Sequence, residues 1–275
     1  MKKAIIFLLV ALSHSGLIAQ TPIARSIQLN WGVGHLIRQD LSFSPMIHRK
    51  WSPFNFQFGY ERKTDKMSHQ IQAGFNMYKP SILEPFEYYG DIPENILTSY
   101  CHNFKQVELN YRFLFPAITG DKLDFSFGGR QRNRLVASEY LYAIASSFAY
   151  YFSFGIDASF QLNYRINEKN QISTNLNTSI FAFNTRSPYL GIDDQYLEDN
   201  YSHNGFKAFL NYIGNGHLQT WDKAQDMDLS VTYEKIISNR WSLITTYSLA
   251  TNFNQSPTNY NSIQNTFFFG GKLKF

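Results

Sequence analysis

The chain has 275 residues, a net charge of +4 at neutral pH, and only 17% charged residues against 17% aromatic ones. Soluble domains usually carry about 25% charged residues, and so small a net charge gives no electrostatic argument for nucleic-acid binding. Cys101 is the only cysteine, which excludes an intrachain disulfide. No segment beyond residue 19 approaches the ~20 apolar residues of a membrane-spanning helix.

Residues 1–19 have the order of a secretory signal peptide. Lys2 and Lys3 precede the apolar run 4–12, and small residues follow as far as Ala19. The apolar run is too short to span a membrane, so we expect cleavage after Ala19. Without the two lysines, 23 basic residues face 21 acidic ones. No Pro/Gly/Ser-rich linker divides residues 20–275, which predicts one domain.

From residue 27 onward, apolar and polar residues alternate with a period of two, as in β-strands that have one apolar face. In the first such segment, Ile27, Leu29 and Trp31 fall on one face, and Gln28 and Asn30 fall on the other. We predict ten strands of this kind. They are residues 27–34, 54–61, 71–78, 106–115, 123–130, 148–165, 172–180, 227–234, 241–249 and 266–275.

The links between the predicted strands alternate in length. Short links follow the second, fourth, sixth and eighth strands, and longer ones, of roughly 10 to 40 residues, follow the others. This alternation predicts an all-β fold: a single transmembrane antiparallel up-and-down β-barrel of about ten strands, with twelve as the alternative count. Short turns then face the periplasm and long loops the exterior. A soluble β-sandwich also alternates along each strand, but it leaves edge strands and does not explain the link lengths.

The last strand places Phe275, Leu273, Phe269 and Phe267 on one apolar face, which Gly271 interrupts. With the signal peptide and the ten strands, it resembles the Gram-negative outer-membrane β-barrel class over essentially the whole mature chain. The resemblance implies location in the cell outer membrane among its lipids. It also implies that the last strand is the signal that the barrel assembly machinery reads. It names no activity.

This resemblance leads to an expected result for the C-terminal residue. Deleting Phe275 should reduce membrane insertion far more than it changes the stability of the folded protein, because the residue acts during assembly. The amount of heat-modifiable barrel in the membrane and the urea midpoint of the purified barrel measure the two effects. Equal insertion of both chains would contradict the assignment.

Charged side chains on the inward faces of the predicted strands form a candidate lumen network. Opposite charges occur in similar numbers, which favours mutual pairing in a largely filled lumen over a narrow polar pathway. The residues are Glu61, Glu108, Arg112, Asp124, Arg130, Asp157, Arg165, Asp228, Glu234 and Lys272.

Candidate catalytic residues are few, so the sequence favours a protein that is not an enzyme. His203 and Asp199 lie together in the 185–224 link, but the stretch resembles outer-membrane phospholipases only faintly, since Gly205 stands where those enzymes carry a serine. Asp226 and Asp228 have the Asp-x-Asp spacing of omptin-like proteases, but no Asp-x-His pair accompanies them. The scattered histidines have no ligand spacing, so we predict no metal site and no cofactor.

The 185–224 link also contains apolar residues with helical spacing, namely Phe206, Phe209, Leu210 and Ile213. They predict a short amphipathic helix, over the barrel mouth or in the outer leaflet, although a continued strand fits nearly as well. Taken together, the sequence predicts a structural or surface-binding barrel whose loops contact an extracellular ligand or an envelope protein. A narrow channel for small solutes and an outer-membrane lipid hydrolase are the alternatives.

Overall fold

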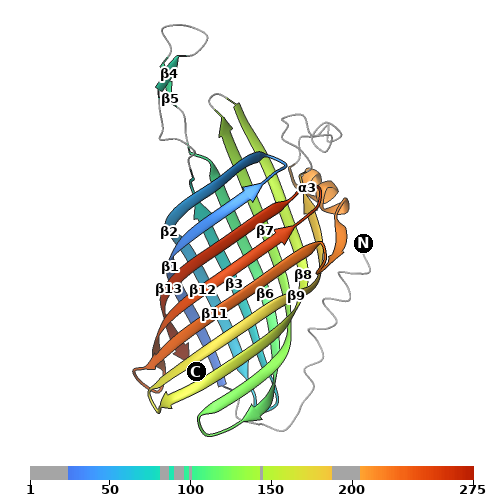
Figure 1. The fold of residues 1–275 in the computed structure, drawn as a ribbon. Helices are drawn as coiled ribbons and strands as arrows, with labels where there is room; N and C mark the ends of the chain where they lie inside the picture. Colours follow the sequence, from blue (N-terminus) through green and yellow to red (C-terminus); the bar gives the residue numbers. More distant parts are fainter. Residues whose placement is uncertain (1–23, 81–86, 90–95, 99–100, 143–144, 188–204) are drawn as a thin grey trace.

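The computed structural model describes residues 24–80, 87–89, 96–98, 101–142, 145–187 and 205–275, and ten long strands in it form a closed barrel (Figure 1). The strands are β1 (Ala24–Asp40), β2 (Ser44–Lys63), β3 (Ser68–Tyr78), β6 (Asn103–Thr119), β7 (Leu123–Tyr142), β8 (Ala145–Asn167), β9 (Asn170–Arg186), β11 (Ala224–Ile236), β12 (Trp241–Asn254) and β13 (Tyr260–Lys274).

Each barrel strand pairs antiparallel with its neighbours in the chain, and two pairings complete the ring. β1 pairs with β13 from Ser26↔Lys274 to Asp40↔Tyr260, and β9 pairs with both β8 and β11. The predicted all-β, ten-strand antiparallel up-and-down barrel is therefore confirmed. Closure leaves no long strand with an unpaired edge, as a barrel surrounded by lipid requires.

The two faces of the barrel wall differ as the alternation predicts. On β1, Leu29 and Trp31 point outward with 64% and 46% of their surface exposed, whereas Asn30 between them is 1% exposed and faces the lumen. On β2, the outward row contains Phe54, Phe56 and Phe58. In the part of the chain that the structure describes, no helix is long and apolar enough to cross a membrane.

The ends of the barrel differ in their links. At one end, residues 64–67, 120–122, 168–169 and 237–240 form short turns, as predicted. The start of β1 and the C-terminal residue lie here too, since the Phe275 amide donates to the Arg25 carbonyl at 3.0 Å. The long links 79–102 and 187–223 confirm the predicted loops at the other end. We call these the turn end and the loop end.

Several strands extend further toward the loop end than the sequence predicted. β1 continues to Asp40 and β7 to Tyr142, and the links after β1, β7 and β12 shrink to residues 41–43, 143–144 and 255–259. The prediction ended these strands where the outward face stopped being continuously apolar. The inward row nevertheless continues, because Leu36, Arg38 and Asp40 pack in the barrel interior.

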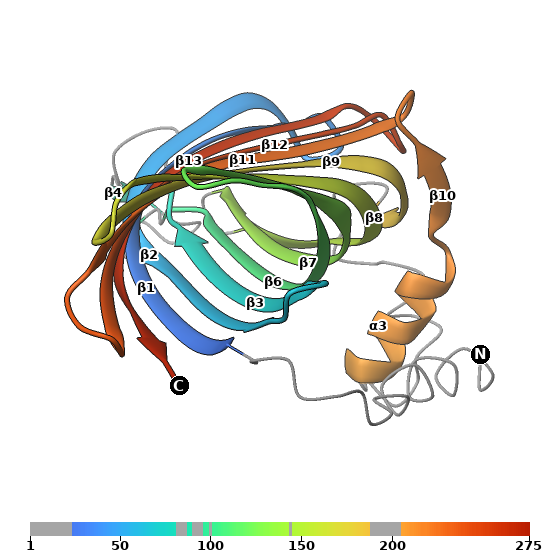
Figure 2. The same ribbon diagram turned by 90° about the horizontal axis from the view of Figure 1, so that it is seen from below.

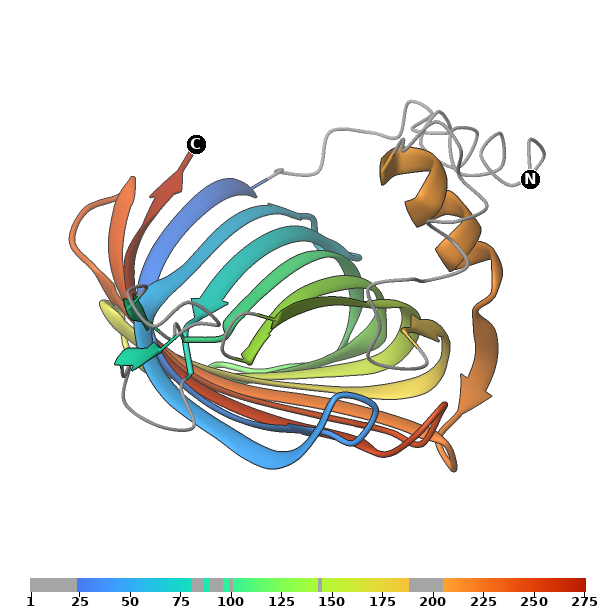
Figure 3. The same cartoon turned by 90° about the horizontal axis from the view of Figure 1, so that it is seen from above.

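The two long links carry additional elements. β4 (Glu87–Tyr89) and β5 (Ile96–Thr98) form a small hairpin that stands beyond the loop end (Figure 1). β10 (His217–Thr220) pairs with the upper part of β9. The predicted helix is confirmed as α3 (Gly205–Gly214). Both end views show it beside the ring of strands and not over the barrel mouth (Figures 2 and 3).

Candidate functional site

The middle of the lumen contains a layer of buried ion pairs, centred on three arginines of β7. Arg130, Arg132 and Arg134 are spaced two residues apart, so all three point inward, and each is at most 6% exposed. Their carboxylate partners come from three other strands: Glu108 of β6, Asp157 of β8, and Asp226 and Asp228 of β11. We call these seven residues the charged layer.

Asp226 is the most heavily shared carboxylate of the charged layer. Its Oδ2 lies 2.7 Å from Nη2 of Arg132, and its Oδ1 lies 2.6 Å from Nη1 of Arg134. The Asn252 amide also donates to it. β7 and β11 are separated in the sheet by β8 and β9, so these ion pairs cross the lumen. Asp226 and Arg132 have no exposed surface, and neither charge would be tolerated there without its partner.

A second group of charges lies above the charged layer, toward the loop end. Asp40 accepts from Nη2 of Arg186 at 2.6 Å and lies 3.5 Å from Nη2 of Arg38. The two guanidinium groups also lie 5.1 Å from the ring centroid of Tyr260, and that of Arg38 lies 4.4 Å from the Phe104 centroid. Such cation–π contacts stabilise buried arginines. This arrangement ties the ends of β1, β9 and β13 to one another.

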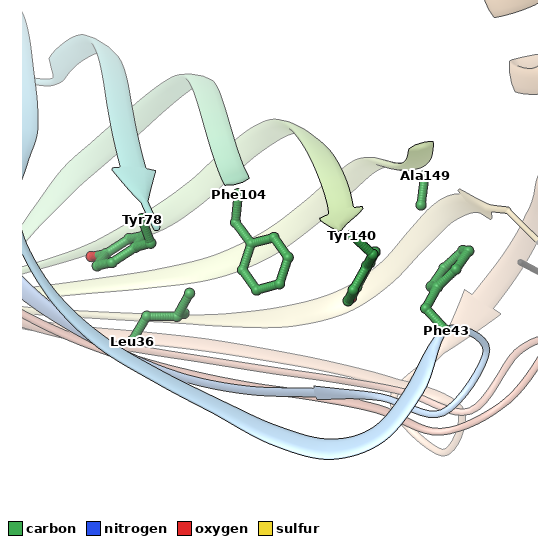
Figure 4. Close-up of a cluster of buried hydrophobic side chains, with 6 residues drawn as sticks. All are labelled: Leu36, Phe43, Tyr78, Phe104, Tyr140 and Ala149. Carbon is green, nitrogen blue, oxygen red and sulfur yellow. The ribbon is translucent and has the colours of Figure 1, made fainter. Parts of the chain in front are cut away.

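Apolar side chains complete the closure of the loop end. Figure 4 shows them projecting from the barrel wall into its interior, where Phe104, Tyr140 and Phe43 lie side by side. The Phe104 and Tyr140 rings are 5.2 Å apart, and those of Phe43 and Tyr140 are 5.3 Å apart. Tyr140 has no exposed surface. The cluster, which we call the aromatic lid, consists of Leu36, Phe43, Tyr78, Phe104, Tyr140 and Ala149.

Below the charged layer the lumen is open. A cavity of about 850 Å³ extends from the turn residues Thr64 and Asp65 upward to Glu108 and Arg130. Its wall is polar, with many glutamine, asparagine, serine and threonine side chains. We call it the vestibule. The sequence predicted a largely filled lumen. In the half of the lumen at the turn end this prediction is wrong, because the small amide and hydroxyl side chains there leave space at the centre.

Ion pairs also line the vestibule at the turn end. Nζ of Lys272 lies 3.0 Å from Oε2 of Glu61 and 3.7 Å from Oε2 of Glu234, and Lys274 also bonds to Glu234. Arg165, which is 44% exposed, pairs with Asp124 at 2.5 Å. These pairs hold the rim strands together but leave the centre of the vestibule free.

The structure places the ten predicted lumen residues in three settings. Glu108, Arg130, Asp157 and Asp228 belong to the charged layer, and Arg112 projects into the vestibule. The rim pairs contain the other five, Glu61, Asp124, Arg165, Glu234 and Lys272.

Several lumen residues were missed by sequence reasoning. Arg132 and Arg134 follow Arg130 at the same two-residue spacing, so continuing the predicted strand past residue 130 would have found them. Arg38 and Asp40 continue the inward row of β1 in the same way. Arg186, by contrast, lies at the end of β9 with no local pattern that marks its partner 146 positions away.

The candidate catalytic residues do not come together in the described part of the chain. His203 and Asp199 lie outside the described residues. Asp226 and Asp228 face the lumen and bond to arginines of β7, and no described histidine contacts either carboxylate. No group of three or more metal-ligating side chains occurs among the described residues.

The residues predicted to form the assembly signal lie on β13, except Phe275, which directly follows this strand. Phe267 and Phe269 are 51% and 53% exposed, and Phe275 is 59% exposed. Leu273 pairs with Ile27 of β1 and Trp241 of β12. Their role in assembly stays a prediction.

Comparison with known proteins gives distant likenesses only. No protein-family model and no curated protein matches the chain. The outer membrane protease OmpT from Escherichia coli has 7% identity and a TM-score of 0.49, with 96% of this chain and 99% of that chain covered. The translocator domain of autotransporter NalP from Neisseria meningitidis has 12% identity and a TM-score of 0.41, with 100% of this chain and 94% of that chain covered. Neisserial surface protein A has 8% identity and a TM-score of 0.37, with 92% of this chain and 99% of that chain covered. Likenesses this distant transfer no activity.

The barrel wall itself decides the class of protein. Its strands close into a ring, its outward rows are apolar and aromatic, and the residues of the charged layer point inward. In a closed sheet, the backbone N–H and C=O groups of each strand form hydrogen bonds with the neighbouring strands. With apolar side chains outside and polar ones inside, such a sheet presents hydrocarbon to lipid, as a membrane-spanning barrel requires. The chain is an outer-membrane β-barrel protein. As expected for such a protein, every link at one end of the barrel is a short turn, and both long links lie at the other end.

Proposed function

We propose that this outer-membrane β-barrel is a structural or surface-binding protein whose lumen does not conduct solutes. The observation that carries the proposal is the complete burial of side chains at successive heights of the lumen. Asp226 and Arg132 in the charged layer, Asn254 above them and Tyr140 in the aromatic lid are all 0% exposed. A barrel of ten strands has a small enough diameter for its own side chains to close it in this way.

The loop end provides the surfaces that would contact a ligand or an envelope partner. The β4–β5 hairpin stands beyond the barrel, and β10 and α3 extend to one side of it (Figures 1 and 3). These elements are connected to a wall that the Arg38–Asp40–Arg186 group and the aromatic lid hold rigid. Binding loops on a rigid scaffold are a common arrangement in surface proteins.

Conductance across a planar lipid bilayer tests the closed lumen directly. We expect the refolded protein to insert and to give no stepwise current, because an ion would have to cross the charged layer and the aromatic lid. A porin reconstituted in the same bilayers is the positive control. Stepwise currents from the folded protein would contradict the proposal.

A narrow channel for small solutes is the second candidate, and the vestibule is the observation in its favour. Its volume of about 850 Å³ would admit a small solute from the turn end. Transport would further require the side chains of the charged layer and the lid to move aside. The same bilayer measurement therefore separates the two functions.

A further inference from the structure

Arg112 differs from the ion-paired cations of the lumen because its hydrogen-bond partners are neutral. Its Nη1 donates to Oδ1 of Asn175 at 2.7 Å, and its Nη2 donates to Oε1 of Gln70 at 2.5 Å. No described carboxylate lies within 4 Å of its guanidinium nitrogens, whereas Arg130, Arg165 and Lys272 each have such a partner. The positive charge of Arg112 is thus without a direct counter-charge among the described residues.

The position of Arg112 makes that charge available to a ligand. The side chain runs from β6 to Asn175 of β9, across the vestibule, and it is only half-buried. A guanidinium has five N–H donors, and the two amide contacts use two of them. Nearby acids do not compete for the rest, since Glu108 bonds to Arg134 at 2.6 Å and Glu61 bonds to Lys272 at 3.0 Å.

The surrounding wall suggests what else the ligand carries. Gln161, Asn163 and Gln264 contribute amides to the vestibule, and Thr232 and Ser248 contribute hydroxyls. Such groups both donate and accept hydrogen bonds, so they match the hydroxyl groups of a polyol. A guanidinium matches an oxyanion with two acceptor oxygens.

We propose that the vestibule is a binding site for a small hydroxylated oxyanion that enters from the turn end, with Arg112 as the anchor of its anionic group. Thr64 and Asp65 of the β2–β3 turn line the mouth through which the ligand passes. The site needs no passage through the charged layer. The proposal is therefore independent of whether the barrel conducts.

Glucose 6-phosphate is a suitable probe, measured by isothermal titration calorimetry with the mature barrel folded in detergent. We expect saturable binding by the unaltered protein and a loss of about ten- to hundredfold in affinity for Arg112→Gln, the range for one charged hydrogen-bonding group. Arg112→Lys should retain part of the affinity because it keeps the charge. Lys105→Gln, which removes an exposed cation of the same strand β6 that does not line the vestibule, should change it by less than about twofold.

Comparison ligands separate the two parts of the proposal. Inorganic phosphate and glucose should each bind more weakly than the sugar phosphate. Glucose binding as tightly as glucose 6-phosphate would overturn the role of the anion, and phosphate binding as tightly would overturn recognition of the hydroxyls. No saturable binding, or equal binding by Arg112→Gln, would overturn the site. Heat-modifiable migration on a gel verifies that each variant is folded.

Discussion

Asp226→Ala is expected to lower the free energy of unfolding by about 3–5 kcal/mol, the range for removing one partner of a buried ion pair. The reason is that both Arg132 and Arg134 depend on this carboxylate. Arg132 has no exposed surface, so water cannot replace the lost partner. Urea unfolding of the barrel in lipid vesicles, followed by tryptophan fluorescence, measures the change.

Asp124→Ala is the matched control for this prediction. It also removes an inward carboxylate that pairs with an arginine, but Arg165 is 44% exposed at the turn end. Solvent then stabilises the remaining charge, so we expect a change below about 1 kcal/mol. Similar losses in the two variants would show that burial of the charged layer does not determine its contribution.

Gly270→Ala is expected to destabilise the seam where β13 meets β1, by about 1–3 kcal/mol or more, as overpacking typically does. A Cβ at this position would meet the Leu29 carbonyl oxygen and the Asn30 side chain, and it would lie 2.9 Å from the Asn30 Cα. Two of these obstacles are backbone atoms of the adjacent strand, which cannot rotate away. We expect a smaller heat-modifiable fraction after refolding and a lower urea midpoint.

The neighbouring glycine offers a control on the same strand. A Cβ at Gly271 would have the Ser242 carbonyl oxygen as its nearest neighbour, at 3.9 Å, which is an ordinary contact. Gly271→Ala should therefore refold and unfold like the unaltered protein. If the two alanine variants behave alike, the close approach of β13 to β1 at Gly270 is not what limits closure.

The charged layer has a structural consequence beyond its stability. It links β7 to β11 across the lumen, while the backbone ladder links each strand only to its immediate neighbours. The Arg112–Asn175 bond connects β6 to β9 in the same way. Such connections across the ring resist flattening of a small barrel. They also place the polar wall of the vestibule around Arg112, whose hydrogen-bond partners are amides.

The transmembrane fold was predictable from local sequence because lipid imposes a simple rule on each strand. Alternate residues must be apolar, as Leu29 and Trp31 are, and the turns must be short at one end. The strand ends were predicted less well. Beyond the membrane, the outward-facing residues no longer have to be apolar. The alternation that identified β1 and β7 therefore ends before the strands themselves do.

The sequence by itself determined the class of fold and the inward direction of most lumen charges, and it favoured a helix where α3 lies. Each of these follows from a local period of two or of 3.6 residues. Only the tertiary structure decided which charges meet. Arg186 reaches Asp40 across 146 positions, Arg134 reaches Asp226 across 92, and Arg112 is left with amides alone. Ring closure and strand register set these partners, and neither is encoded in the spacing of the residues along one strand.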